Sequence, residues 1–296
     1  MAKIPDNADI LPPSDDRIFK VLLTHRNAEP VLRSVVSTVI ERPVVSVQVV
    51  NTELPVSDVE EKAQRLDVNC VIDGGDQINV EMQSSPMEEA AGDDNRHTSF
   101  RNRFTYYTTA LHSSQKSKGV MYDELARSFQ ITFCGYTLFP ERLDFVNRIA
   151  LRWPDGEQFS DQINMVVVEM GKLAGIQNKP AETLTPLEMW SAFFMFAPEE
   201  EYRDLINNII SIKEEIGMAS ALLMEISKDD HERALFRSRK KAEMDLFSNL
   251  HTAEKRGRTL GRTEGMALGE TRGMARVFEL LEKGVSLEDA KKMLGI

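Results

Sequence analysis

The chain has 296 residues, a formal net charge of −11 and a pI of about 5.1. Hydrophobic residues make up 42% and charged residues 28%, which is the balance of a globular protein with enough apolar material for a core. The acidic balance excludes a protein that coats nucleic acid by charge alone, although a local basic patch or a bound cation can still meet phosphate.

Three further features concern the cellular compartment. The sequence has no run of about eighteen apolar residues, so no membrane-spanning helix is expected. Its start, MAKIPDNADILPPSDD, lacks the basic-then-apolar order of a signal peptide. Only two cysteines occur, Cys70 and Cys134, and both lie in apolar alternating segments. We therefore expect two buried, reduced thiols and a cytoplasmic protein.

Two helices are predicted near the N-terminus. The first starts near Arg17, where the pattern of apolar residues fits one helical face. Its cap is one of three polar residues, Ser14, Asp15 or Asp16. The second helix runs over about 28–41, with apolar residues at 3.6 spacing, and Pro43 ends it.

An α/β pattern follows. Segments rich in β-branched or alternating apolar residues predict strands at 44–54, 65–72 and 77–84. Asp73-Gly74-Gly75-Asp76 separates the last two and is a strong hairpin signal. The next elements in order are a helix at 99–116 and a strand at 129–138. This order predicts an α/β fold in which the second and third strands form a hairpin.

The second half of the chain should contain another hairpin and then helices. Trp153-Pro154-Asp155-Gly156 fits a turn between strands at 149–153 and 163–170. From Thr185 onward the sequence reads as helical, and apolar residues at 205–226 recur in steps of four and three. This stripe fits a helix packed on its own domain, which is the commoner case, or an intermolecular coil.

The C-terminal tail has a repeat of glycine at every fourth position. Its members are Gly257, Gly261, Gly265, Gly269 and Gly273. In a helix they form a slowly drifting stripe, yet each glycine costs about 1 kcal/mol relative to alanine. We expect either a marginal, partly helical tether or a self-association surface. Two short helices are predicted over 277–296, the second capped by Ser286 with Asp289.

The first hairpin brings two carboxylates together on one face. If the loop comprises Asp73, Gly74 and Gly75, residue 72 faces residue 76, and Asp67 lies opposite Glu81. Because side chains alternate between faces, Asp67, Glu81 and Gln83 then share one face. A loop of two residues would break this parity, so the inference depends on the loop length.

Paired carboxylates of this kind suit a divalent cation. Two carboxylates a few ångströms apart repel each other, and a shared cation removes that cost. Oxygen ligands in an incomplete cage are what Mg²⁺ prefers, with water and phosphate oxygens completing its shell. Such a site points to phosphodiester hydrolysis. Carboxylates on a solvated strand face are the common alternative.

The motif resembles the D…(D/E)-x-K core of PD-(D/E)XK nucleases, with Gln83 where the lysine usually lies. More narrowly, the chain is similar to the recombination-promoting nuclease (Rpn) family, also described as transposases of the PD-(D/E)XK type. Local matches carry this resemblance over about residues 11–170: Asp16-Arg17-Ile18-Phe19-Lys20, Asn51 to Pro55, Lys62 to Val68, Gln77 to Gln83, Arg103 to Tyr107, Ser113-Ser114-Gln115 and Leu138-Phe139-Pro140. The glycine-repeat tail matches loosely.

The resemblance implies roles for several residues. Asp67 and Glu81 would be metal ligands. Gln83 would orient the attacking water or a phosphate, but a neutral amide acts neither as a base nor as a cation.

The remaining candidates come from the helices and from the approach to the second strand. Asp16 is a candidate third acid, or else a plain helix cap. Lys20 and Lys62 could contact phosphate, with solvated lysines as the alternative. Arg103 suits a bidentate phosphate contact, with a surface salt bridge as the alternative.

These observations predict a restriction-endonuclease-like α/β core at 11–175, a helical extension at 176–255 and a glycine-repeat tail at 256–296. The expected function is Mg²⁺-dependent DNA endonuclease activity, which the resemblance links to recombination or mobile elements. The alternatives are a DNA-binding or regulatory module that keeps the fold without efficient cleavage, and a structural oligomer formed through the helical C-terminal region.

Overall fold

The computed structural model describes residues 3–50, 68–84, 95–115 and 121–295. The chain divides into two compact units, Met1–Arg233 and Ala234–Ile296. The described α-helices of the first unit are α1 (Asp16–Thr24), α2 (Glu29–Ile40), α3 (Asn95–Ser113), α4 (Pro186–Phe196), α5 (Arg203–Ile212) and α6 (Glu214–Lys228). Short 3-10 turns occur at Tyr122–Glu124, Met170–Lys172, Ile176–Asn178, Ala181–Thr183 and Glu200–Tyr202.

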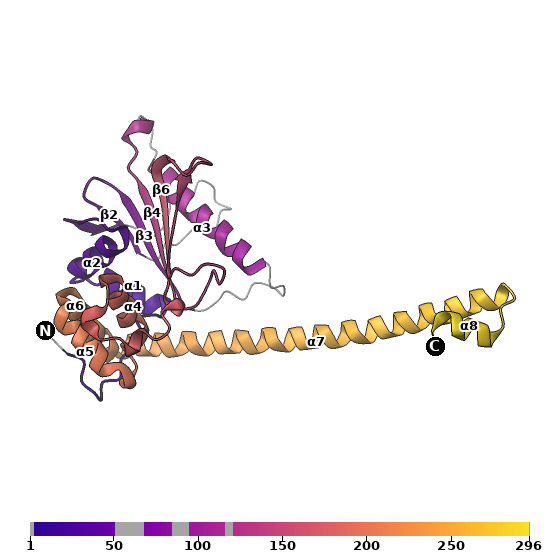
Figure 1. The fold of residues 1–296 in the computed structure, drawn as a ribbon. Coiled ribbons are helices and arrows are strands. Elements are labelled where there is room, and N and C mark those ends of the chain that lie inside the picture. Colours follow the sequence, from indigo (N-terminus) through magenta and orange to yellow (C-terminus); the bar gives the residue numbers. More distant parts are fainter. Residues whose placement is uncertain (1–2, 51–67, 85–94, 116–120, 296) are drawn as a thin grey trace. The chain divides into compact units, whose positions relative to one another are not determined.

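A mixed six-stranded sheet lies at the centre of the first unit (Figure 1). Its strands are β1 (Val47–Val49), β2 (Val68–Ile72), β3 (Gln77–Gln83), β4 (Ser128–Cys134), β5 (Val146–Arg152) and β6 (Gln158–Glu169). Their spatial order is β1-β2-β3-β4-β6-β5. The β3-β4 and β4-β6 pairs are parallel, while the hairpins β2-β3 and β5-β6 and the edge pair β1-β2 are antiparallel. Helix α3 lies between β3 and β4 in the sequence, as a parallel pair requires.

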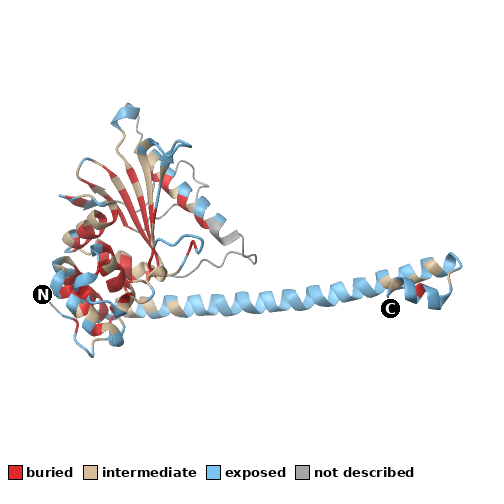
Figure 2. Ribbon diagram, viewed as in Figure 1, coloured by how far each residue is buried: buried red, intermediate tan, exposed pale blue. Residues whose placement is uncertain are grey.

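One face of this sheet is a conventional apolar core. Its buried side chains from β3, β4 and β6 include Ile78, Val80, Met82, Ile131, Phe133, Val166 and Val168. Phe133 packs against Phe19 of α1 and Phe194 of α4, with ring centroids 5.9 and 5.3 Å apart. Helices α1 and α4 therefore pack on this face, and Figure 2 shows buried residues in the sheet and in the helices beside it.

The opposite face is covered by α3 and is mixed in character. Phe100 and Phe104 of α3 pack with Cys134 and Val167 of the sheet in a small apolar cluster. Beside that cluster, β3 and β4 bury polar side chains, among them Asn79, Glu81, Gln130 and Thr132. Figure 1 shows α3 on the side of the sheet away from α1 and α2.

Several elements differ in extent from the predicted ones. The strand predicted at 44–54 is β1 over only Val47–Val49 within the described residues, because the Asp73 carboxylate accepts the backbone N–H groups of Val45 and Ser46. The strand predicted at 129–138 is β4 and ends at Cys134. The helix predicted at 99–116 is α3, and it begins at Asn95.

The helices after the sheet belong to the same compact unit. Helix α4 begins with Thr185 as cap, whose hydroxyl accepts the N–H of Glu188 while the Glu188 carboxylate accepts the N–H of Thr185. The apolar stripe predicted over 205–226 is divided between α5 and α6, and most of its residues are buried within the unit. The interpretation as helices packed on their own domain is therefore confirmed.

The second unit is helical. Helix α7 (Asp230–Glu282) includes all five repeat glycines. A methyl group in place of the hydrogen at any of these glycines would meet no neighbouring side chain of the described residues within 4 Å, so none of those residues packs against the stripe. The first of the two short helices predicted over 277–296 is the end of α7 rather than a separate element. The second is α8 (Leu287–Leu294), and Ser286 caps it by accepting the N–H of Asp289 at 3.2 Å.

Candidate active site

The β2-β3 hairpin has the predicted register. Val68 pairs with Val80 and Cys70 with Ile78, as a three-residue loop requires. The N–H of Ile72 donates to the carbonyl of Asp76 at 3.1 Å, and Gly75 has a φ of 87°, so the loop has the left-handed position that glycine tolerates. Asp67, the residue before β2, lies outside the described residues.

Glu81 lies in the middle of β3 on the face that α3 covers. It is 9% exposed. Its Oε1 accepts the Gln83 Nε2–H at 2.6 Å and lies 3.5 Å from the Arg103 guanidinium, while its Oε2 accepts the Gln130 Nε2–H at 3.2 Å. Three donors therefore converge on one buried carboxylate.

Gln83 lies two residues further along and is the last residue of β3. Its amide N–H contacts Glu81 directly, so the prediction that these two residues share a face is confirmed. The backbone carbonyl of Gln83 accepts the N–H of Gly135, which follows β4. The carboxyl ends of the parallel strands β3 and β4 therefore meet beside this amide.

Arg103 comes from α3 and approaches Glu81 from above the sheet. Its side chain is 25% exposed, and its guanidinium lies 6.0 Å from the ring centroid of Phe100. The alternatives for Arg103 were a phosphate contact and a surface salt bridge. The structure shows a partly buried ion pair with Glu81, which places a cation beside the candidate metal ligand. Whether this guanidinium also binds phosphate stays a prediction.

The remaining candidates belong to α1 or lie outside the described residues. Asp15 caps α1, since its carboxylate accepts the N–H groups of Arg17 and Ile18. Asp16 is the first residue of α1 and accepts the Arg17 N–H at 2.8 Å. Lys20 lies one turn further along the same helix. Lys62 falls outside the described residues.

Sequence reasoning missed three neighbours of Glu81. Gln130 touches it directly, and Asn79 donates to the Gln130 carbonyl oxygen at 2.9 Å. Tyr136 follows β4, and burial raises the pKa of its phenol, with Glu81 and Arg103 acting on it in opposite directions. The available signal was the alternation that places Asn79 on the same face of β3 as Glu81, and the polar Gln130 in β4.

Two other buried carboxylates have structural roles. Asp76 accepts hydrogen bonds from the side chains of Arg42 and Arg127 and so joins the β2-β3 loop to the start of β4. Glu169, fully buried at the end of β6, accepts the N–H groups of Leu138 and Phe139 at 2.6 and 2.8 Å.

The two cysteines are buried and free, as predicted. Burial raises the pKa of the Cys70 thiol to about 12. Burial also raises the pKa of the Cys134 thiol, with the carboxylates of Glu169 and Glu81 adding to the effect. Neither group is a candidate nucleophile, because the reactive species is the thiolate.

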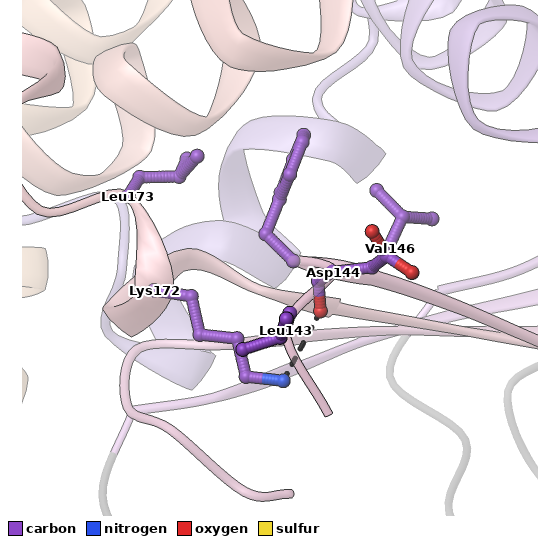
Figure 3. Close-up of a pocket in the computed structure, with 6 residues that line it drawn as sticks. Leu143, Asp144, Val146, Lys172 and Leu173 are labelled. Carbon is purple, nitrogen blue, oxygen red and sulfur yellow. Dashed lines mark hydrogen bonds between the residues drawn. The ribbon is translucent and has the colours of Figure 1, made fainter. Parts of the chain in front are cut away.

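A pocket of about 350 Å³ lies beside the carboxyl end of β6 (Figure 3). Its lining residues are Leu143, Asp144, Phe145, Val146, Lys172 and Leu173. The Lys172 ammonium donates to the Asp144 carbonyl at 3.1 Å and to the Glu169 carboxylate at 2.6 Å. The Lys172 ammonium thus joins the segment before β5 to the end of β6, and Glu81 is not among the residues that line the pocket.

The oxygen atoms at Glu81 and Gln83 are of the type that binds a hard divalent cation. Glu81 offers carboxylate oxygens and Gln83 an amide oxygen, which are the ligand types that Mg²⁺ takes. Within the described residues, no group of three or more His, Cys, Asp or Glu side chains is placed to hold a metal ion. The second predicted carboxylate, Asp67, falls outside those residues.

Comparison with known proteins adds an independent line of evidence. One family model, described as PD-(D/E)XK nuclease family transposase, matches residues 13–253. A search of the curated proteins and a search of the solved structures returned no match. The family match and the mixed sheet flanked by helices together confirm the predicted restriction-endonuclease-like fold class.

Proposed function

The chain belongs to the PD-(D/E)XK nuclease family of transposases, and on that premise we propose that it is a metal-dependent DNA endonuclease. The reaction is hydrolysis of phosphodiester bonds, in the setting of recombination or mobile-element activity. The observation that carries this proposal is the Glu81 carboxylate, buried on the polar face of the sheet with Gln83 and Arg103 at its Oε1.

The acidic, basic and neutral side chains of this site have different proposed roles. Glu81 and Asp67 hold a divalent cation, Mg²⁺ in our proposal. When bound, such a cation polarises the phosphate and lowers the pKa of a bound water. Arg103 binds a phosphate oxygen beside Glu81, because a guanidinium offers two parallel donors to that group. Gln83 orients the water or the phosphate through its amide, without taking a proton.

Three further residues complete the proposal. Asp16 is a third acid at the start of α1, and Lys20 and Lys62 contact the DNA backbone. These roles rest on the family motif and on the sequence positions. The structure supports α1 as a fixed element, since Phe19 is fully buried against the sheet.

The setting of the protein is part of the same proposal. We propose a cytoplasmic protein with DNA as its partner, organised as the nuclease domain at 11–175, the helical extension at 176–255 and the tail at 256–296. A homo-oligomer through the C-terminal helical region would help to place two cuts on a duplex. In the ranges that the structure describes, every helix is too short or too polar to cross a membrane.

Cleavage of supercoiled plasmid tests the proposal. Wild-type protein should nick plasmid with Mg²⁺ and leave it intact with EDTA. Asp67→Ala and Glu81→Gln should each reduce the rate more than about 100-fold, since loss of outer-shell partners alone costs about 10–100-fold. Arg101→Ala, on the exposed side of α3, is the control for protein quality.

Intact plasmid across divalent metals and protein concentrations would contradict the nuclease. If DNA binding then persisted in Asp67→Ala, the protein would be a DNA-binding or regulatory module that keeps the fold. Gln83, the neutral residue in the lysine position, would be the first cause to examine.

A further inference from the structure

Three buried side chains form a chain of hydrogen bonds that ends on Glu81. Asn79 donates from Nδ2 to the Gln130 Oε1 at 2.9 Å, and Gln130 donates from Nε2 to the Glu81 Oε2 at 3.2 Å. Asn79 is 1% exposed and Gln130 is fully buried. This chain of hydrogen bonds, Asn79–Gln130–Glu81, is called the relay; it crosses from β3 to β4 and back to β3.

The parallel register of β3 and β4 explains why the three side chains meet. Asn79 pairs with Gln130, and Glu81 pairs with Thr132, two residues further along. All four side chains point to the face that α3 covers, because positions two apart in a strand share a face. The long Gln130 side chain therefore reaches both Asn79, its partner in the register, and Glu81, two residues further along β3.

The relay fixes the direction of the Gln130 amide. The Asn79 NH₂ group can only donate, so it must meet the carbonyl oxygen of Gln130. The Gln130 NH₂ group is then left to face Glu81. The opposite orientation would place a carbonyl oxygen against a carboxylate, where neither group can donate.

Burying these amides is costly for stability. On the other face, the corresponding positions of β3 and β4 are filled by Ile78, Val80 and Ile131. Buried polar groups lower the stability of a core unless they are fully hydrogen-bonded. The Oδ1 atom of Asn79 and the hydroxyl of Thr132 have no hydrogen-bond partner among the described residues. An incompletely satisfied polar layer of this kind is expected where a function requires it.

We propose that Gln130 is a positioning residue that orients the Glu81 carboxylate for cation binding, and that Asn79 sets the orientation of Gln130. The inference rests on the proposed metal site at Glu81. Gln130 holds Oε2 from β4, while Gln83 and Arg103 lie at Oε1, so the carboxylate plane is fixed from both sides. Donors held this way keep an ionised ligand ready for the cation.

Mn²⁺ binding to the full chain tests this inference separately from catalysis. The probe is Mn²⁺ alone, and the free ion is measured by electron paramagnetic resonance without DNA. Gln130→Met keeps the side-chain volume but removes both hydrogen bonds. We expect the Kd for Mn²⁺ to rise about tenfold or more. Plasmid cleavage should recover when Mn²⁺ is raised, which a damaged fold would not allow.

Thr132→Val is the matched control. Thr132 is fully buried on the same strand and the same face, and its hydroxyl has no hydrogen-bond partner within the described ranges. This variant removes a buried polar atom without touching the relay, so its Kd should stay within twofold of wild type. If Gln130→Met does not fold, Gln130→Asn keeps the amide but withdraws it by one methylene, and it should show the same loss.

The outcomes separate the two proposals. A Kd for Mn²⁺ within twofold of wild type in a folded Gln130 variant overturns the inference, as does an equal loss in Thr132→Val. Wild-type protein that binds Mn²⁺ through Gln130 but does not cut DNA overturns the nuclease alone. Wild-type protein that binds no Mn²⁺ overturns both.

Discussion

On one face of the central sheet, β3 and β4 present Val80, Ile131 and Phe133 to the helices α1 and α4. On the other face, the same two strands present Glu81 and Gln130 beneath α3. Apolar packing makes the first face a source of stability, since buried apolar area is favourable without any directional requirement. The second face buries groups that must be hydrogen-bonded one by one. This difference is what we expect if one face mainly stabilises the fold and the other holds the proposed site.

The largest expected effect comes from the apolar face. Phe133→Ala should lower the free energy of unfolding by about 3–5 kcal/mol, because Phe133 is fully buried between Phe19 and Phe194. Urea unfolding monitored by circular dichroism measures it. Thr132→Val, the adjacent residue on the other face, should change that free energy by less than about 1 kcal/mol. Similar losses in both variants would break the comparison between the two faces.

A smaller effect is expected from the cation on the polar face. Arg103→Ala should weaken DNA binding and reduce the slope of log affinity against log salt by about one, the change for one lost phosphate contact. Fluorescence anisotropy with labelled duplex in Ca²⁺ measures the slope. Arg101→Ala is the matched control, since Arg101 lies two residues earlier and pairs with Glu141 on the surface. Equal slopes for wild type and Arg103→Ala would show that Arg103 serves only as the partner of Glu81.

The smallest effect concerns pH. His112 lies in the last turn of α3, and its Nδ1 is 3.1 Å from the hydroxyl of Ser128 in β4. Burial lowers the pKa of the His112 imidazole. Since the folded state disfavours the charged imidazole, stability is complete above the unfolded-state pKa of about 6.5 and falls as the pH drops below it. His112→Gln should lessen this acid-side loss of melting temperature, whereas His251→Gln, an exposed histidine of α7, should not. The same acid-side loss in wild type and His112→Gln would contradict this assignment.

The sequence was sufficient for the local geometry of the site and insufficient for its long-range contacts. The Asp73-Gly74-Gly75 turn fixed the register of β2 and β3, because turn chemistry and strand alternation are local properties. The same reasoning placed Glu81 and Gln83 on one face, and the hydrogen bond between their side chains confirms this.

The contacts made by β4 were beyond sequence reasoning. Gln130 lies 49 residues from Glu81 in the chain, and their approach depends on the register of a parallel pair whose connection contains α3. No turn specifies that register. The short β1 had a similar cause, since the side chain of Asp73 takes two backbone donors that a longer strand would have used.

The central claim is that Glu81 holds a divalent cation on the polar face, and affinity cleavage by Fe²⁺ tests it most directly. Fe²⁺ bound in place of Mg²⁺, with ascorbate and peroxide, generates radicals that cut the backbone near the ion, and mass spectrometry locates the cuts. We predict cuts in β3 beside Glu81 that Mg²⁺ suppresses and that Glu81→Gln abolishes. Cuts confined to other elements, or unchanged in Glu81→Gln, would contradict the account.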